Sequence, residues 1–261
     1  MGPGHIDDDH APGVEDILNE AQRRLQERGQ QEIPARQAWV DRLNRGVFWL
    51  ARHWLAVFNA LTGLFVGGAL LPPVLLKLGL PGAADLLYAI YRPLCHQYPF
   101  RSWFLFGPQF AYPLTAPIHV GEMNKLRSLI GDAHIGYKTA LCQRDIAIYG
   151  CMLLAGLVYA VLRRRKTIQP WPMWAYFAFG IVPMMLDGGI QWISYAAWVF
   201  FPAFIRMPFE TTPLMRALTG ALFGLGIVAA AYPYLNEYFE DVHRVLQQKY
   251  STIIPSLEVT L

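Results

Sequence analysis

Long stretches without charged side chains constrain this chain more than any other feature. Residues 54–76 make up 23 consecutive positions with no formal charge, and three later stretches are nearly as apolar. A helix of about 20 apolar residues can cross the hydrocarbon core of a bilayer. Only 16% of all residues are charged, against about 25% in a typical soluble domain. The sequence therefore predicts an all-α integral membrane protein.

We expect about four transmembrane helices within a membrane domain that covers residues 47–235. The predicted spans run over about 54–76, 146–162, 171–191 and 214–235. In the last of them, Gly220 and Gly224 are four positions apart, a spacing of small residues that favours close packing between transmembrane helices.

Two outer loops, 77–145 and 192–213, connect these spans. In the first loop, residues 83–92 predict a short amphipathic helix that lies along the membrane surface. In the second, the apolar stretch 192–205 would reach only about 21 Å as a helix, which is too short to cross the core. We interpret it as a re-entrant or interfacial segment.

The two ends of the chain are predicted to be cytoplasmic. An N-terminal arm, 1–46, is expected to be partly helical after a disordered start, with Pro34 ending one helix, and residues 236–261 form a tail. Arginines that precede the first span, together with the basic run 163–166 after the second, favour this orientation by the positive-inside rule. The location expected is the cell inner membrane.

Charge and motifs narrow the function classes. The net charge is only +3, with basic residues beside the spans, so nucleic acid is not an expected partner. There is no Gly-rich phosphate loop, no GxSxG and no HExxH in the sequence. Membrane lipids, and protein subunits of a larger complex, are the expected partners.

Four potential metal ligands are predicted to meet at the outer face: Cys95, His96, Cys142 and Asp145. Thiolate, imidazole and carboxylate groups all bind zinc, and four of them would complete a structural site. Cys142 and Asp145 are three residues apart, so a helix would place them on one face. The expected cofactor is one zinc or other transition-metal ion. A Cys95–Cys142 disulfide and free thiols remain open alternatives.

Further polar residues are predicted to gather at the same outer ends of the spans. They are Gln97, Arg101, Arg144, Asp187, Gln191 and Arg216. An acid such as Asp187 at membrane depth is costly unless it is paired or functional. Either Arg144 or Arg216 could neutralise it in an ion pair, and the functional alternative is a carboxylate that binds a proton or a substrate.

These residues occur in motifs that resemble the DUF2085 family of uncharacterised membrane proteins. The motifs are Cys95-His96-Gln97-x-Pro99-x-Arg101-Ser102-Trp103, Gly107-x-Gln109, Leu141-Cys142-x-Arg144 with Tyr149, Asp187-Gly188-x-x-Gln191, and Leu214-x-Arg216-x-x-Thr219-Gly220-x-x-x-Gly224. The resemblance covers roughly residues 86–232 and implies a small multi-helix membrane protein, without implying an activity.

The chain departs from the family pattern in two ways. Where the family commonly has CxRC, this chain has Cys142-Gln143-Arg144-Asp145. Residues 111–140 also expand the link between two of the motifs, and the stretch 192–212 is longer than expected. Because both additions fall on the predicted outer side, they favour a docking surface.

The leading hypothesis is a non-catalytic accessory or assembly subunit of a larger membrane complex. Its outer Cys/His/Asp cluster would hold a structural metal or a disulfide that braces the loop 93–145. The alternative is a membrane-embedded enzyme that acts on a lipid or lipid-linked substrate at the outer interface. In that case Cys95 and His96, or a metal-bound water, would do the chemistry, with Asp187 and Arg216 orienting the substrate.

Overall fold

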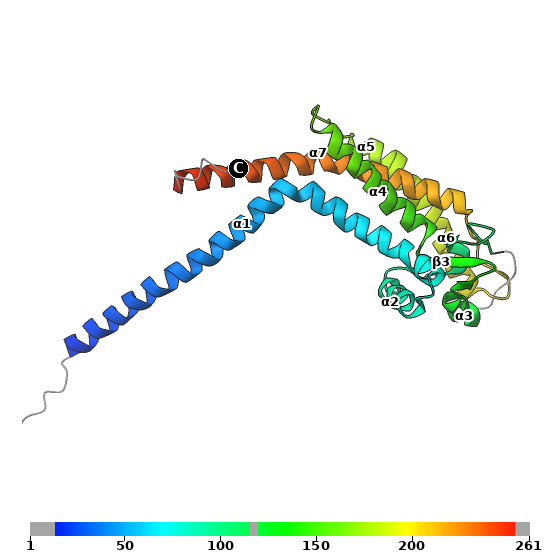
Figure 1. Cartoon of the computed structure of the whole chain (residues 1–261), viewed down its shortest axis with the longest axis horizontal. Helices are drawn as coiled ribbons and strands as arrows, with labels where there is room; N and C mark the ends of the chain where they lie inside the picture. Colours follow the sequence, from blue (N-terminus) through cyan, green and yellow to red (C-terminus); the bar gives the residue numbers. More distant parts are fainter. Residues whose placement is uncertain (1–13, 115–119, 254–261) are drawn as a thin grey trace, which may run out of the picture. The chain divides into compact units, whose positions relative to one another are not determined.

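The computed structural model describes residues 14–114 and 120–253, which form mostly helices and one small sheet (Figure 1). The chain divides into two units, residues 1–52 with 242–261 and the larger unit His53–Asp241. The predicted disordered start, residues 1–13, lies outside the described residues. All of the functional residues considered below belong to the larger unit.

Within the described ranges, four helical segments are long and apolar enough to cross a membrane. They are Arg36–Lys77, Gln143–Leu162, Met173–Phe200 and Pro213–Gln248. Leucines such as Leu64 and Leu154, exposed by 74% and 63%, point away from the protein, as lipid-facing side chains do. The predicted fold class, an all-α membrane protein with four spans, is therefore confirmed.

The first and last of these helices extend well beyond their predicted spans. Helix α1 covers Val14–Lys77 and includes Pro34, which was expected to end a helix. Proline removes one backbone donor, and one missing hydrogen bond does not end a helix of 64 residues. Helix α7 covers Pro213–Ile253, so much of the predicted C-terminal tail is helical.

The third span corrects the prediction for residues 192–205. Helix α5 (Met173–Tyr176), the π-helical segment η3 (Phe177–Ile181) and helix α6 (Val182–Phe200) follow one another directly. The helix therefore continues past Gln191 rather than giving way to a separate re-entrant segment. Gln191 does not end it because this amide is buried and hydrogen-bonded to other parts of the protein.

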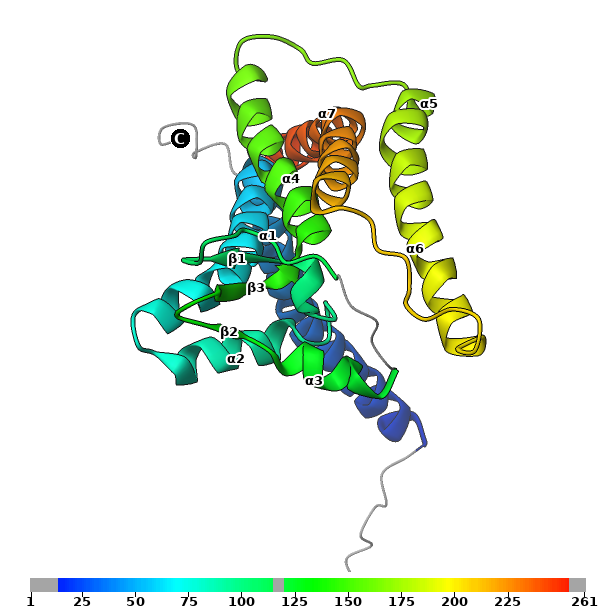
Figure 2. The same cartoon turned by 90° about the vertical axis from the view of Figure 1, so that its right-hand side faces the viewer.

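The first outer loop contains more regular structure than expected. Helix α2 (Pro81–Tyr91) agrees with the predicted short helix. After η1 (Pro99–Arg101), the chain forms an antiparallel sheet in the order β1-β3-β2 (Figure 2). Its strands are β1 (Ser102–Leu105), β2 (Gly131–Asp132) and β3 (Gly136–Cys142), with η2 (Val120–Glu122) and α3 (Met123–Ser128) between β1 and β2.

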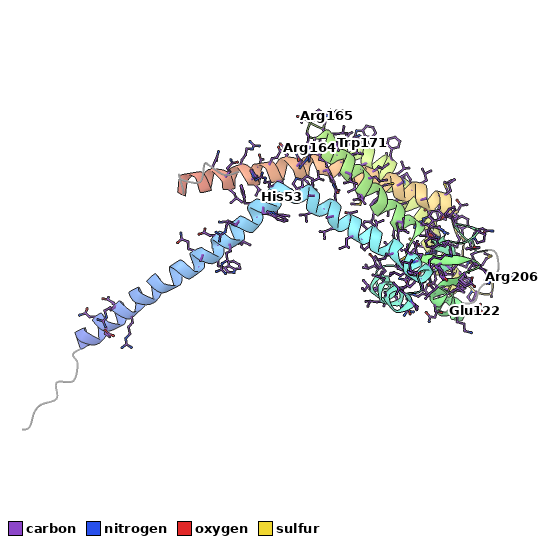
Figure 3. The ribbon with its side chains drawn as sticks, viewed as in Figure 1. His53, Glu122, Arg164, Arg165, Trp171 and Arg206 are labelled. Atoms are coloured by element: carbon purple, nitrogen blue, oxygen red, sulfur yellow. The ribbon has the colours of Figure 1, made fainter. Side chains whose placement is uncertain are left out.

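The larger unit has two distinct ends. One, the basic end, carries the turn that joins helix α4 (Gln143–Leu162) to α5, with Arg164, Arg165 and Trp171 (Figure 3). The other, the sheet end, carries the sheet, α3 and the segment between α6 and α7 that includes Arg206 (Figure 3).

Close backbone contacts and two apolar clusters hold the four spans together. A Cβ atom at Gly220 would lie 2.7 Å from the Arg144 carbonyl oxygen, and one at Gly224 would collide with the Ile148 carbonyl. Glycine is needed at both positions for α7 to pack this closely against α4, as the small-residue spacing predicts. One cluster joins α1, α4 and α7 around Trp54. The other joins α1, α2 and β3 below the candidate site, around Tyr88.

Candidate functional site

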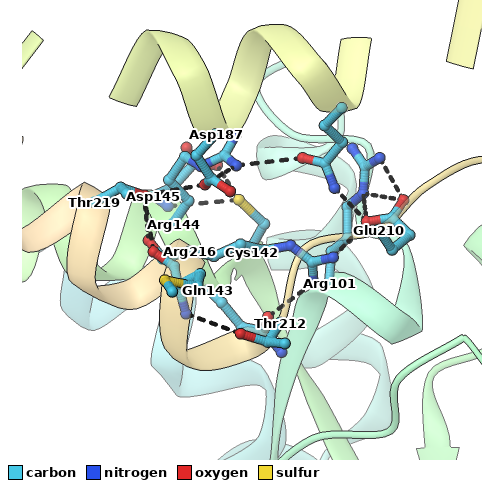
Figure 4. Close-up of polar contacts among 12 residues, drawn as sticks. Arg101, Cys142, Gln143, Arg144, Asp145, Asp187, Glu210, Thr212, Arg216 and Thr219 are labelled. Carbon is cyan, nitrogen blue, oxygen red and sulfur yellow. Dashed lines mark hydrogen bonds and ion pairs between the residues drawn. The ribbon is translucent and has the colours of Figure 1, made fainter. Parts of the chain in front are cut away.

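The central acid of the sheet end is Glu210, in the segment between α6 and α7. Its carboxylate is 8% exposed and accepts hydrogen bonds from Arg101, Arg216, Gln191 and Tyr195 (Figure 4). Arg101 Nε lies 3.0 and 3.1 Å from the two carboxylate oxygens. Donors from three separate parts of the chain therefore converge on one buried charge.

The two arginines that pair with Glu210 are themselves fixed by other groups. The Arg101 guanidinium lies 4.6 Å from the centre of the Tyr195 ring. Burial acts against the charge of Arg101, but the hydrogen bond and charge of Glu210 outweigh it and raise the pKa of Arg101. Arg216 Nη1 donates to the Phe100 carbonyl at 3.0 Å and to Gln143 Oε1 at 3.1 Å. These contacts fasten the start of the sheet to α4 and α7.

Asp187, the acid predicted at membrane depth, forms its ion pair with Arg144. Thr219 Oγ1 donates to the same carboxylate at 3.0 Å. Arg144 also reaches Gln191 Oε1 at 3.3 Å, and Gln191 in turn donates to Glu210. Asp187 and Glu210 are thus connected through Arg144 and the side-chain amide of Gln191. We call this assembly the Glu210 network; it comprises Arg101, Arg144, Asp187, Gln191, Tyr195, Glu210, Arg216 and Thr219.

Beside this network lie three potential metal ligands, which we call the Cys–Asp group. Single ligand atoms of Cys95, Cys142 and Asp145 all lie within 4.8 Å of one another. Cys142 is the N-cap of α4, where its Sγ accepts from the Asp145 backbone N–H at 3.5 Å and lies 3.1 Å from Asp145 Oδ2 (Figure 4). The start of this helix therefore positions two of the three side chains.

The two thiols affect each other's ionisation. Hydrogen bonding to Cys142 lowers the pKa of Cys95, although burial and the Asp145 charge oppose this. The same interaction, together with burial and Asp145, raises the pKa of Cys142 well above its usual range. Cys95 is therefore the more acidic of the pair. All three cysteines of the chain are free thiols in this structure.

The structure does not bring the predicted ligand His96 into the Cys–Asp group. Cys95 is buried by the turn that follows α2, where its N–H donates to the Tyr91 carbonyl at 3.0 Å. His96 is exposed and stacks on Tyr98 instead. Directly after His96, the backbone turns sharply at Gln97, which has a φ of +56°. Burial and the nearby Arg101 and Arg127 lower the pKa of His96.

Gln97 also has a structural role in this turn. Its side chain is buried, and its Nε2 donates to the Tyr88 carbonyl at 2.9 Å. The Gln97 carbonyl accepts from the ammonium group of Lys138 at 2.7 Å. These contacts hold the residues after α2 against β3.

Lys138 is a buried charge that the sequence did not point to. It is 1% exposed, and its Nζ donates to the carbonyls of Gln97 and Arg127, each at 2.7 Å. Burial lowers the pKa of Lys138 to about 8. The lysine therefore joins the turn after α2 to the end of α3, with neutral acceptors in place of a carboxylate.

An open pocket of about 540 Å³ lies next to the Cys–Asp group. The residues that line it are Ala89, Arg92, Pro93, Leu94, Cys95, His96 and Arg127. Cys95 thus borders both the pocket and the potential metal ligands. Two arginines give the pocket a cationic wall.

The site includes residues that sequence reasoning missed, above all Glu210, Tyr195 and Gln143. One signal could have revealed Glu210. Three arginines, Arg101, Arg144 and Arg216, were predicted at the outer ends of the spans, with only Asp187 as a candidate partner. A surplus of buried guanidinium groups requires a further acid nearby.

Comparison with known proteins adds a family relationship. The family model described as "Predicted membrane protein (DUF2085)" matches residues 126–230. The resemblance to the DUF2085 family is confirmed. The matched DUF2085 region includes Cys142, Asp145 and most of the Glu210 network, whereas Cys95, His96 and Arg101 precede it.

A relative is similar in sequence over a longer stretch. The uncharacterized protein MJ1492 of Methanocaldococcus jannaschii is 25% identical to this chain over 158 residues, covering 60% of this chain and 72% of the relative. No solved structure matches the chain. The similarity to DUF2085 thus points to a membrane protein without assigning an activity to it.

Proposed function

We propose that this protein is a non-catalytic membrane protein in which the Cys–Asp group holds a structural transition-metal ion, with zinc the first candidate. The observation that carries the proposal is the convergence of Cys95, Cys142 and Asp145 within 4.8 Å from two distant parts of the chain. Two thiols and a carboxylate are donors that zinc accepts. A four-coordinate zinc would take a further donor from outside this group.

A metal ion at this position would connect two elements that are distant in the sequence. Cys95 follows α2, whereas Cys142 and Asp145 lie at the beginning of α4. Coordination would fix the turn after α2 to the N-terminus of a membrane span. A disulfide between Cys95 and Cys142 would brace the same two elements and is the alternative form of this proposal.

The hydrogen bonding and burial of the two acids in the Glu210 network support a structural role for the sheet end. Glu210 and Asp187 receive hydrogen bonds from arginines and from neutral donors. An acid that serves as a proton carrier or substrate ligand needs an accessible oxygen, whereas these carboxylates are 8% and 7% exposed. Such a network is typical of residues that fix the register of packed helices.

We further propose that the sheet end docks onto another subunit of a membrane complex. Several aromatic side chains on its loops are exposed, and they are Phe106, Phe110, Phe204 and Phe209. Exposed apolar groups of this kind often mark interaction sites. Much of the two stretches expected to be longer than the family pattern lies at this end: residues 120–140 include α3, β2 and most of β3, and residues 201–212 join α6 to α7. Purification from native membranes as a monomer without a stable partner would contradict this part of the proposal.

The test of the metal site is the metal content of the detergent-purified protein, measured by inorganic mass spectrometry. We expect about one metal ion per chain, and its loss in the Cys142→Ala variant. Cys151→Ala is the matched control, because Cys151 lies within α4 and is not part of the Cys–Asp group. Metal-free wild-type protein would refute the metal site. Mass analysis after thiol alkylation, with and without reductant, would then show whether a disulfide replaces it.

One observation favours the enzyme alternative, namely the open pocket beside Cys95 and His96. Against it, Arg216, which would orient the substrate, is held by Glu210, Gln143 and the Phe100 carbonyl. An activity toward a lipid-linked substrate that is lost in His96→Ala and retained in His134→Ala would favour the enzyme. His134 is a suitable control because it is exposed in the turn between β2 and β3.

A further inference from the structure

We propose that the pocket between α2 and α3 binds the phosphate group of an anionic membrane lipid. It is lined by the side chains of Arg92, Arg127 and His96, and it lies beside an exposed apolar face of α2. The inference is independent of the metal, because the groups that would contact the phosphate are outside the Cys–Asp group.

The charge of the pocket is the first argument. None of its described lining residues is acidic, whereas two are arginines. Guanidinium groups bind phosphate through charge-assisted hydrogen bonds. The carboxylate that acts on His96 belongs to Asp145, which lies 3.1 Å from the Cys142 sulfur. Asp85, one turn before Ala89 on α2, does not line the pocket.

The position of Arg127 is the second argument. Its Nη2 donates to the Arg92 carbonyl at 2.7 Å, and this bond holds the guanidinium at the wall of the pocket. Its Nε is buried and has no hydrogen-bond partner among the described residues. Because this nitrogen is buried, a ligand in the pocket would interact with the charge of the guanidinium rather than with Nε. The pocket therefore contains a fixed, positively charged donor group.

The apolar surface next to the pocket distinguishes a lipid from a soluble anion. Leu86, Ile90 and Leu94 recur every four residues along α2 and the turn after it, and they are 63%, 53% and 61% exposed. This spacing places them on one face of the helix. The opposite face, with Ala84, Tyr88 and Tyr91, is buried in the protein. A phosphate in the pocket would thus have a surface for acyl chains directly beside it.

The experiment measures lipid binding to the full-length protein in a neutral detergent by native mass spectrometry. Phosphatidylglycerol is titrated against the wild type and Arg92→Gln, with phosphatidylcholine and inorganic phosphate as separate arms. We expect phosphatidylglycerol to bind more tightly than the other two, and Arg92→Gln to weaken its binding about tenfold. Arg206→Gln is the matched control, since Arg206 is exposed at the sheet end and does not line the pocket.

A second variant keeps the test informative if Arg92→Gln folds poorly. Ala89 is exposed and lines the pocket, so Ala89→Glu would place a negative charge at its wall and should weaken binding similarly. Equal binding of the two lipids, or equal loss in Arg92→Gln and Arg206→Gln, would overturn the proposal. Inorganic phosphate binding as tightly as phosphatidylglycerol would overturn the assignment to a lipid.

Discussion

The Glu210 network and the Cys–Asp group lie side by side at the sheet end but differ in how fully their polar atoms are used (Figure 4). In the network, the buried carboxylate of Glu210 has two arginine partners and two neutral donors. In the Cys–Asp group, two sulfurs and a carboxylate face one another with few donors between them. Potential metal ligands are concentrated in the second region. In the first, both carboxylates are hydrogen-bonded, although Arg144 Nε and Arg216 Nε are buried without a partner among the described residues.

This difference indicates how the two regions contribute to the protein. Carboxylates that are paired with arginines and neutral donors stabilise one arrangement of the helices. Two thiols and a carboxylate held close together are instead a set of groups that a transition-metal ion could bind. The sequence predicted a single constellation at this end, and the structure separates it into the Glu210 network and the Cys–Asp group, for which we propose a structural and a metal-binding role, respectively.

Among the tests of this comparison, Glu210→Gln should cause the largest loss of stability. The variant leaves Arg101 and Arg216 without their shared carboxylate, and breaking a buried ion pair typically costs about 3–5 kcal/mol. We expect the free energy of unfolding in detergent to fall by that amount. Glu237→Gln, at an exposed position of α7, should leave stability unchanged. Equal stability of the two variants would show that the network is not structural.

Lys138→Met tests a buried charge that has only neutral partners. The folded lysine has a pKa of about 8, below its ordinary value of 10.5, so between these pH values the unfolded chain binds more protons. Stability should therefore rise with pH from about 8 to 10.5, by about 3 kcal/mol, as the penalty on the charged lysine disappears. Lys138→Met should lack this rise, whereas Lys125→Met, exposed on α3, should retain it. Parallel pH profiles for the wild type and Lys138→Met would contradict the prediction.

Removal of metal by a chelator tests the proposal that the Cys–Asp group binds a metal ion. A ligand present at 100 times its Kd stabilises the folded state by about 2.7 kcal/mol. Chelation should lower the unfolding free energy of the wild type by about this amount and should not affect Cys142→Ala. The Cys151→Ala variant should respond like the wild type. A chelator effect that persists in Cys142→Ala would place the metal elsewhere.

Of the four tests described, Asp187→Asn should lower the free energy of unfolding least. Its partner Arg144 is 16% exposed, against 3% for Arg216, so water can solvate part of the charge that is left. The asparagine can still accept from Thr219. We expect a loss of about 1–3 kcal/mol in unfolding free energy, with no change for Asp85→Asn, an exposed site on α2. A greater loss than in Glu210→Gln would reverse the order of the two acids.

The transmembrane helices could be predicted from sequence because lipid imposes a long apolar pattern on each of them. The end of the third span could not, since the polar Gln191 was expected to mark its outer end. In the structure this amide is buried between Arg144 and Glu210, so the helix continues to Phe200. Tertiary contacts, which local sequence does not encode, determined that boundary.

The sheet and Glu210 escaped prediction for related reasons. Strands β1 and β2 have only four and two residues, too few for an alternating pattern to emerge. Glu210 lies in an irregular segment, and its importance arises from arginines 6 and 109 positions away in sequence. The convergence of Cys95 and Cys142 was foreseeable because both flank membrane spans. The outward direction of His96, which stacks on Tyr98, was not.

The close approach of α4 and α7 limits how the protein can move. At Gly220 and Gly224 the two main chains touch with no side chain between them. Sliding either helix along the other by one turn, about 5.4 Å, would bring bulkier residues into that contact. These two spans must therefore travel as one rigid body through any conformational cycle. Relative motion would fall to the third span, whose π-helical turn already departs from regular winding.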